Sequence, residues 1–210
     1  QTARNHLQRG GRGRAADITA TLLSAWAQLG LKETGHAVET VDRLRGESSY
    51  NLFRDYHAGL IADVAGNVGE ATKRLKTAYD AERTTLRYVD AWGRFLALRG
   101  QTEAAKQIYA EFDAILPDHP VIREARRKLE AGQPLKRFVS SPQEGAAEAL
   151  FGLGSVGNRQ GDEVAALIYL RLALYLDPHH EMAILTVGDI LERLKQGEDA
   201  VAVYATMPKD

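Results

Sequence analysis

The sequence predicts an all-α fold built from repeated antiparallel helix hairpins. Ala and Leu, the strongest helix formers, dominate the 210 residues, whereas Pro occurs only 6 times. Small residues recur with a period of 34 residues, which suits two short helices and their turns. Alanine marks this period at Ala3, Ala37, Ala71 and Ala105 and again at Ala166 and Ala200, and glycine marks it at Gly59 and Gly93 and at Gly154 and Gly188.

The clearest repeat, residues 147–180, shows how each element begins and ends. Its first helix ends at Gly161, because glycine favours the end of a helix. Asp162 can cap a second helix over 163–176, and Pro178 follows the end of that helix because it lacks a backbone N–H. Two helices of about 14 residues joined by a short turn form an antiparallel hairpin.

Two small residues of this repeat fall where its helices must cross. Gly154 lies in the middle of the first helix and Ala166 near the start of the second. A missing or minimal side chain lets the two backbones approach closely. We therefore expect the periodic glycines of this helical chain to serve helix packing and hairpin turns.

This pattern resembles the tetratricopeptide repeat, or TPR, as found in bacterial TPR-repeat proteins. The residues that match the family's pattern are Leu153-Gly154, Gly161-Asp162, Ala166, Ala173 and Asp177-Pro178. The resemblance implies a right-handed superhelix of antiparallel hairpins, an α-solenoid. Single repeats depart from the pattern, since Lys32 replaces the turn glycine and Arg83 the terminating proline.

The repeat predicts two blocks of hairpins with one interruption. The N-terminal block covers 1–119, with a partial repeat at 1–17 and repeats at 18–51, 52–85 and 86–119. A lone helix and a connector occupy 120–146. The C-terminal block covers 147–210, with repeats at 147–180 and 181–210.

The interruption lies where the period between Ala105 and Ala166 is seven residues short. Residues 121–131 form a basic amphipathic helix, and 132–140 have no helical periodicity. Ser141 and Pro142 then start a new helix as its N-cap and first position. The segment 132–140 is either a packed irregular connector, or a hinge or a strap across the superhelical groove.

Charge and composition exclude several classes of partner. With 27 Lys+Arg against 28 Asp+Glu, the formal net charge of −1 gives no general attraction for nucleic acid. No apolar run in this sequence reaches the roughly 18 residues of a membrane span. The absence of Cys excludes disulfides, thiolate nucleophiles and Cys-ligated metals.

The chemistry-bearing motifs are weak, so we expect no enzyme, no cofactor and no metal. There is no Gly-x-Ser-x-Gly elbow and no phosphate-binding loop, and Ser155 follows glycines that helix packing explains. His179-His180-Glu181 falls in a turn between repeats, where adjacent side chains diverge too far to bind one metal well.

The concave groove is the remaining candidate site. In the TPR family, ligand peptides lie against first helices, and the resemblance carries this role to Phe53, Tyr56, Leu60, Arg87, Asp90, Arg94, Arg159 and Asp189. The family's carboxylate clamp for chaperone tails is not expected, because it requires a set of Lys, Asn and Arg at positions that are Tyr56, Leu60, Asp90 and Arg94 in this sequence. The alternative is that Phe53, Tyr56 and Leu60 are buried by a neighbouring repeat. Trp26 is expected to be a packed interior residue.

These observations favour a non-catalytic scaffold that binds a peptide or helix of another protein in the groove. The helix expected over 1–9 has no capping residue before Gln1, as if it were cut. The alternative is therefore a regulatory or assembly domain of a larger protein whose catalytic or membrane-anchoring part lies outside this sequence. A homodimer through exposed terminal repeats is a further expectation. The lack of Cys is compatible with an exported, periplasmic location, the alternative being the cytoplasm.

Overall fold

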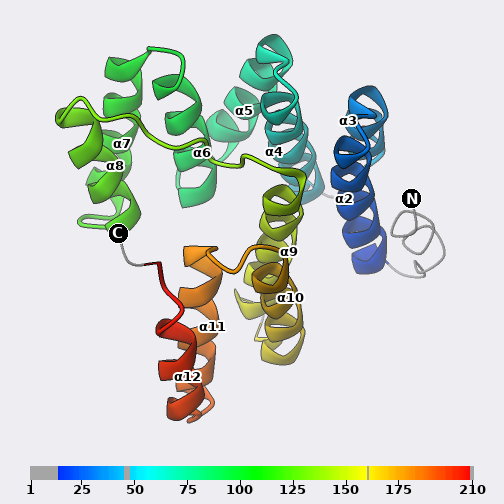
Figure 1. Ribbon diagram of the computed structural model, residues 1–210, viewed down its shortest axis with the longest axis vertical. Helices are drawn as coiled ribbons and strands as arrows, with labels where there is room; N and C mark the ends of the chain where they lie inside the picture. Colours follow the sequence, from blue (N-terminus) through cyan, green and yellow to red (C-terminus); the bar gives the residue numbers. More distant parts are fainter. Residues whose placement is uncertain (1–13, 45–47, 160, 209–210) are drawn as a thin grey trace. The chain divides into compact units, whose positions relative to one another are not determined.

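The computed structural model describes residues 14–44, 48–159 and 161–208, which form helices, turns and irregular segments without a strand (Figure 1). The predicted helix over 1–9 lies outside these residues. The described helices are α2 (Arg14–Gly30), α3 (Thr34–Asp42), α4 (Ser48–Val64), α5 (Val68–Ala81), α6 (Leu86–Ala97), α7 (Thr102–Ile115), α8 (Pro120–Glu130), α9 (Pro142–Arg159), α10 (Glu163–Leu176), α11 (Glu181–Arg193) and α12 (Gly197–Tyr204).

Consecutive helices pack as hairpins, which confirms the predicted all-α, TPR-like fold. The pairs are α2 with α3, α4 with α5, α6 with α7, α9 with α10, and α11 with α12. Helix α8 has no such helical partner after it, because residues 132–140 are not helical. The repeat is therefore interrupted once, at the predicted segment.

The helices group into two compact units. The first, the discontinuous unit, contains α2, α3 and α9 to α12, whereas the middle unit contains α4 to α8 and the segment up to Ser140. This grouping differs from the sequence-based division at 119 and 147. Within the discontinuous unit, α2 packs both against α3, its hairpin partner, and against α9, which is far from it in the sequence.

The hairpin turns use left-handed backbone, as the glycine period indicates. Gly66, Gly100 and Gly161 have φ angles of 80°, 76° and 79°. Lys32 occupies the same place in the first hairpin with φ 63°. The turn therefore keeps its geometry even where the sequence lacks the preferred glycine.

Four of the five hairpins named above pair a glycine at the helix crossing with a large side chain sixteen residues later. At Gly154, an added Cβ would lie 2.8 Å from Cγ of Leu170 and 3.2 Å from the carbonyl oxygen of Ala166. The predicted close approach of these helices is thereby confirmed. The four pairs are Gly59 with Leu75, Gly93 with Tyr109, Gly154 with Leu170, and Gly188 with Tyr204.

The discontinuous unit is held together by the packing of α2 on α9. Trp26 is buried, as expected, and a Cβ at Gly145 would lie 2.2 Å from Cζ3 of its ring. Gly30 faces Pro142, so the two helices run antiparallel. Helix α2 also reaches α10, because the hydroxyl groups of Thr19 and Tyr169 lie 3.0 Å apart.

Local capping residues act as the sequence predicts. Asp162 accepts a hydrogen bond from the backbone N–H of Ala165 at 3.0 Å and starts α10. Ser141 accepts one from Glu144 N at 3.2 Å, and its hydroxyl contacts the Glu144 carboxylate at 3.2 Å.

Within the part of the chain that the structure describes, no helix is both long and apolar enough to cross a bilayer.

Candidate functional site

Residues 133–140, here called the strap, lie across the first helices of the middle unit (Figure 1). Leu135 and Val139 of the strap are buried, whereas Lys136 and Arg137 keep exposed side chains. The strap touches α4 and α6, the two helices that carry most of the predicted groove residues. The predicted groove of this unit therefore already holds an extended segment of the same chain.

Phe138 is the aromatic anchor of the strap. Its ring meets Tyr56 of α4 edge-on, with centroids 6.3 Å apart. The guanidinium of Arg87 of α6 lies 4.2 Å from the centroid of the same ring, a cation–π contact. Tyr56 also packs against Tyr88 at 4.7 Å, so both helices contribute to the surface that receives Phe138.

A buried carboxylate orients the arginine that binds the strap backbone. Asp90 accepts hydrogen bonds from Nε of Arg94 and from the hydroxyl of Tyr109, each at 2.9 Å. Arg94 then donates from Nη1 to the carbonyl oxygen of Lys136 at 3.4 Å. Because this contact uses a backbone carbonyl, it accepts any side chain at that position.

The charges of this cluster reinforce one another. Burial would lower the pKa of Arg94, but the Asp90 carboxylate outweighs it and the pKa is raised. Burial, together with the negative charge of Asp90, holds the pKa of Tyr109 well above its ordinary value. The arginine therefore stays charged and the phenol neutral, the states that their hydrogen bonds require.

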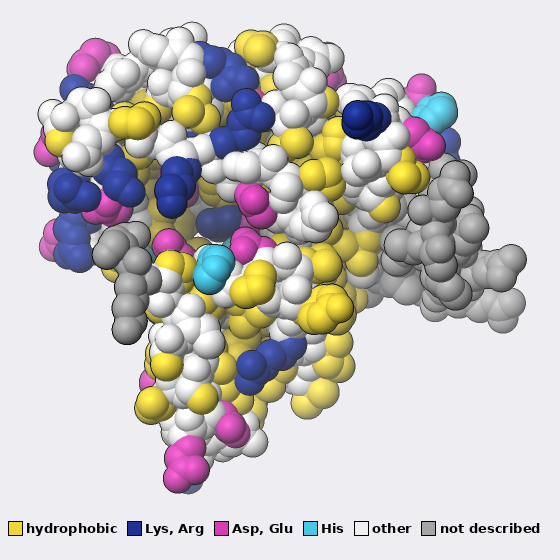
Figure 2. Space-filling model, in the orientation of Figure 1, with side chains coloured by type: hydrophobic (Ala, Val, Ile, Leu, Met, Phe, Trp, Pro, Cys, Tyr) yellow, Lys and Arg dark blue, Asp and Glu magenta, His cyan; other side chains and the backbone are white. Residues whose placement is uncertain are grey.

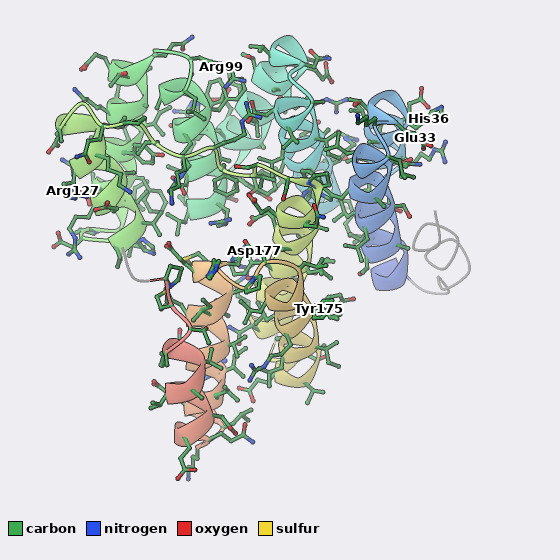
Figure 3. The ribbon with its side chains drawn as sticks, in the orientation of Figure 1. Glu33, His36, Arg99, Arg127, Tyr175 and Asp177 are labelled. Atoms are coloured by element: carbon green, nitrogen blue, oxygen red, sulfur yellow. The ribbon has the colours of Figure 1, made fainter. Side chains whose placement is uncertain are left out.

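A second buried carboxylate holds the arginine of the strap. Nε of Arg137 lies 3.6 Å from Oδ2 of Asp63, and Nη1 donates to the Asp63 carbonyl oxygen at 3.4 Å. Arg99, which follows α6 and is labelled in Figure 3, donates to Oδ1 of the same carboxylate at 2.6 Å. Arg99 also lies over the ring of Phe95, 3.6 Å from its centroid. Asp63 of α4 thus joins the turn after α6 to the strap.

The predicted site residues are divided between the two units. In the middle unit, Tyr56, Arg87 and Arg94 contact the strap directly, and Asp90 acts through Arg94. Tyr56 and Leu60 are both buried, as the alternative interpretation of the aromatic patch expects, whereas Phe53 is half-buried and stacks on His57 with centroids 6.2 Å apart.

The other two predicted residues belong to the discontinuous unit. Asp189 accepts a hydrogen bond from the hydroxyl of Tyr204 at 3.0 Å, and Arg159 is exposed at the end of α9. Sequence reasoning missed Phe138 and Arg99. The Arg137-Phe138 pair within an otherwise non-helical run was the available signal for the strap.

The histidine motif between the last two repeats serves structure. His180 accepts a hydrogen bond at Nδ1 from Ala183 N and caps α11, and its Nε2 lies 3.0 Å from the buried Glu148 carboxylate. Phe151 packs on the ring with centroids 4.8 Å apart. Across the described ranges, no three His, Asp or Glu side chains are grouped to hold a metal ion.

Helix α10 exposes an apolar stripe. Val164, Ile168, Leu172 and Tyr175 are 72%, 57%, 47% and 82% exposed and follow each other at helical spacing. Figure 2 shows hydrophobic side chains at the surface over α9 and α10, and Figure 3 shows Tyr175 projecting away from its helix. The stripe is a second candidate interaction surface, separate from the strap.

Comparison with known proteins gives only distant structural likenesses. No protein family matches this sequence, and no curated protein matches it. A solved structure of MamA AMB-1 has a TM-score of 0.38 at 12% identity, covering 90% of this chain and 88% of that chain. Another crystal structure of MamA has a TM-score of 0.37 at 14% identity, covering 86% and 90%.

A structure of MamA MSR-1 has a TM-score of 0.35 at 13% identity, covering 87% of this chain and 89% of that chain. At these TM-scores the superpositions are weak. The TPR-like fold of this chain therefore depends on its own hairpins, glycine crossings and turns.

Proposed function

We propose that this protein is a non-catalytic interaction scaffold and that its partner-binding groove is the surface of the middle unit now covered by the strap. The observation that supports this is the strap itself, an extended segment held by Tyr56, Arg87 and Arg94. These are groove positions expected from the TPR resemblance. The side chains of this surface bind both side chains and a backbone carbonyl of one extended segment. Such a surface is suited to bind another extended segment in the same way.

The contacts indicate recognition rather than catalysis. Arg94 is tied to Asp90, and Asp63 is tied to Arg99, so their charges are already paired. Paired charges fix the geometry of a binding surface and add selectivity, whereas a catalytic base needs a free group beside the substrate. The groove is therefore proposed as a protein-binding surface.

The proposal is tested by capture of a partner with the full chain and with Arg87→Glu. Arg87 is chosen because it is half-buried and contacts Phe138, so its reversal changes the groove without emptying the core. Arg123→Glu, an exposed change on α8, is the matched control. We expect one partner to be retained by the wild type and Arg123→Glu and lost by Arg87→Glu. Equal recovery by all three folded proteins would show that the groove is not the site.

A second interaction is favoured by the apolar stripe of α10, with another copy of this chain as its occupant. The spacing of the stripe is self-complementary: in an antiparallel pair of α10 helices, Val164 meets Tyr175 of the other copy, and Ile168 meets Leu172. Each contact then occurs twice about the two-fold axis. Four side chains per copy make a small interface, so a weak, concentration-dependent dimer is expected.

Sedimentation equilibrium tests this dimer. Ile168→Glu places a charge at the centre of the stripe, and Val201→Glu places one on α12, where Val201 is also exposed. We expect the wild type and Val201→Glu to dimerise with the same dissociation constant and Ile168→Glu to remain a monomer. A wild-type protein that is monomeric at about millimolar concentration contradicts the dimer.

A further inference from the structure

We propose that the groove of the middle unit recognises an extended protein segment with an arginine, an aromatic residue and an aliphatic residue in succession, and that this segment binds by displacing the strap. The strap presents this order as Arg137-Phe138-Val139. The inference depends on the proposed function and adds to it the chemistry of the partner and the regulation of the groove.

The arginine position follows from Asp63. Its carboxylate is buried, and Arg99 occupies Oδ1 while Oδ2 faces Arg137 of the strap. Arg137 also donates to the Asp63 carbonyl oxygen. A guanidinium reaches a carboxylate oxygen and a carbonyl together because its donors are arranged as a planar fork, whereas a lysine offers a single charged point. The groove therefore favours Arg over Lys at this position.

The aromatic position follows from the two faces that enclose Phe138. Tyr56 meets the ring edge-on, and Arg87 lies over the ring face at 4.2 Å. An aliphatic side chain has no negatively charged ring face for the guanidinium, so the cation–π contact selects Phe, Tyr or Trp. The aliphatic position follows from Val139, which is buried directly after Phe138.

The backbone just before the arginine is bound without regard to the side chain there. Arg94 binds the carbonyl oxygen of Lys136, whose side chain is exposed. The residue before the arginine is thus free to vary. The resulting pattern is specific at three consecutive positions and tolerant before them.

The strap is suited to exchange because it is neither helix nor strand and has an exposed flank at Gly132 and Gln133. As a tethered ligand it acts at an effective concentration on the order of millimolar. A free segment making the same contacts must compete with that concentration, so the closed groove lowers the apparent affinity for the partner. Loosening the tether should raise this affinity without changing the groove.

The test measures binding of a fluorescent peptide with the sequence of residues 133–141 to the full chain by anisotropy. In one variant, about ten Gly and Ser residues are inserted between Gly132 and Gln133, which lengthens the tether and keeps every groove contact. In a second variant, Arg137→Ser removes a half-exposed strap side chain. The control peptide carries Ala in place of Phe138.

We expect both variants to bind the peptide about tenfold more tightly than the wild type does. The control peptide should bind none of them, and Arg87→Ala in the insertion variant should weaken binding, whereas Arg83→Ala should not. Arg83 is a suitable control because it lies over Tyr79 rather than over the strap.

Equal affinity of the wild type and both variants would overturn the proposed displacement of the strap, and binding that ignores Phe138 or Arg87 would overturn the proposed partner chemistry. Circular dichroism verifies that each variant is folded, and Arg137→Ser alone suffices if the insertion variant is not. Either result would leave the proposed function standing. A partner captured through Arg87 would still show that the groove binds proteins, even if the peptide with the strap sequence does not bind there.

Discussion

The phenol ring of Tyr109 lies directly against Gly93 where α6 and α7 cross. A Cβ at Gly93 would lie 2.6 Å from Cζ and 2.8 Å from the hydroxyl oxygen of Tyr109. The ring cannot easily shift away from an added Cβ, because it is buried and its hydroxyl is hydrogen-bonded to Asp90 at 2.9 Å. This single crossing thus connects the repeat glycine to the carboxylate that orients Arg94 under the strap.

Gly93→Ala is therefore expected to destabilise the protein by about 1–3 kcal/mol through overpacking. Urea unfolding followed by circular dichroism measures the loss. Gly35→Ala is the matched control, because a Cβ there meets nothing within 4 Å in helix α3. That substitution should be neutral or stabilising by about 0.5–1 kcal/mol. Equal losses at both positions would contradict the role of the crossing.

The sequence predicts what is local and periodic. Gly161 favours the left-handed turn and Asp162 favours the N-cap position because of their own conformational preferences. Helix α10 therefore begins where the pattern indicates. Likewise, Gly154 reveals a crossing because a helix interior otherwise disfavours glycine. These features need only neighbours within one hairpin.

The sequence does not predict contacts between distant segments. The packing of Trp26 on Gly145 joins α2 to α9, and nothing in a 34-residue period favours that pair over sequential stacking. Similarly, Phe138 and Arg87 meet only because the strap returns across α6. The groove residues could be inferred from the TPR resemblance, but their occupant could not, since it depends on the path of a segment without periodicity.

Cleavage by trypsin after Lys136 or Arg137 should be slow in the native protein. Both side chains are exposed, but a protease needs the backbone to leave the groove, and the buried Leu135 and Val139 oppose this opening. Phe138→Ala removes the aromatic anchor and should accelerate cleavage several-fold, as measured by mass spectrometry of timed digests.

The matched control for this digestion is Gln133→Ala, an exposed change in the same strap. Its cleavage rate should equal that of the wild type. Rapid native cleavage at Lys136 and Arg137 would instead indicate a hinge, the alternative that the sequence left open.

The buried pair of His180 and Glu148 should stabilise the discontinuous unit. His180 accepts at Nδ1 from Ala183 N, so its neutral ring carries a proton on Nε2 and donates it to Glu148. His180→Ala removes the cap of α11 and leaves a buried carboxylate with one partner fewer. The expected loss is about 1–3 kcal/mol in chemical unfolding.

The conservative variant separates the two roles of His180. Asn is a good N-cap, so His180→Asn should recover the capping part of the loss but not the contact with Glu148. A double-mutant cycle with Glu148→Gln measures the contact itself. A coupling energy near zero would show that the two side chains are merely adjacent.

Tyr204 should ionise only at unusually high pH. Burial comes first among the causes, followed by the hydrogen bond to the Asp189 carboxylate and its negative charge and then by the same two effects of Glu192, and together they raise the pKa of Tyr204 to about 12. An unfolded tyrosine has a pKa of about 10. The folded state therefore favours the neutral phenol, and the stability this gives is complete below about pH 10 and is lost as the pH rises towards 12.

Titration of ¹³Cζ-labelled tyrosine by NMR checks this value, with Tyr204→Phe identifying the signal. Asp189→Asn removes a negative charge beside the phenol and should lower the pKa of Tyr204. Glu198→Gln, on the same helix as Tyr204 but not among the groups that act on it, should leave the pKa unchanged. If Asp189→Asn left the titration of Tyr204 where it is in the wild type, the carboxylate would not be what keeps the phenol neutral, and the 3.0 Å contact would be one of packing alone.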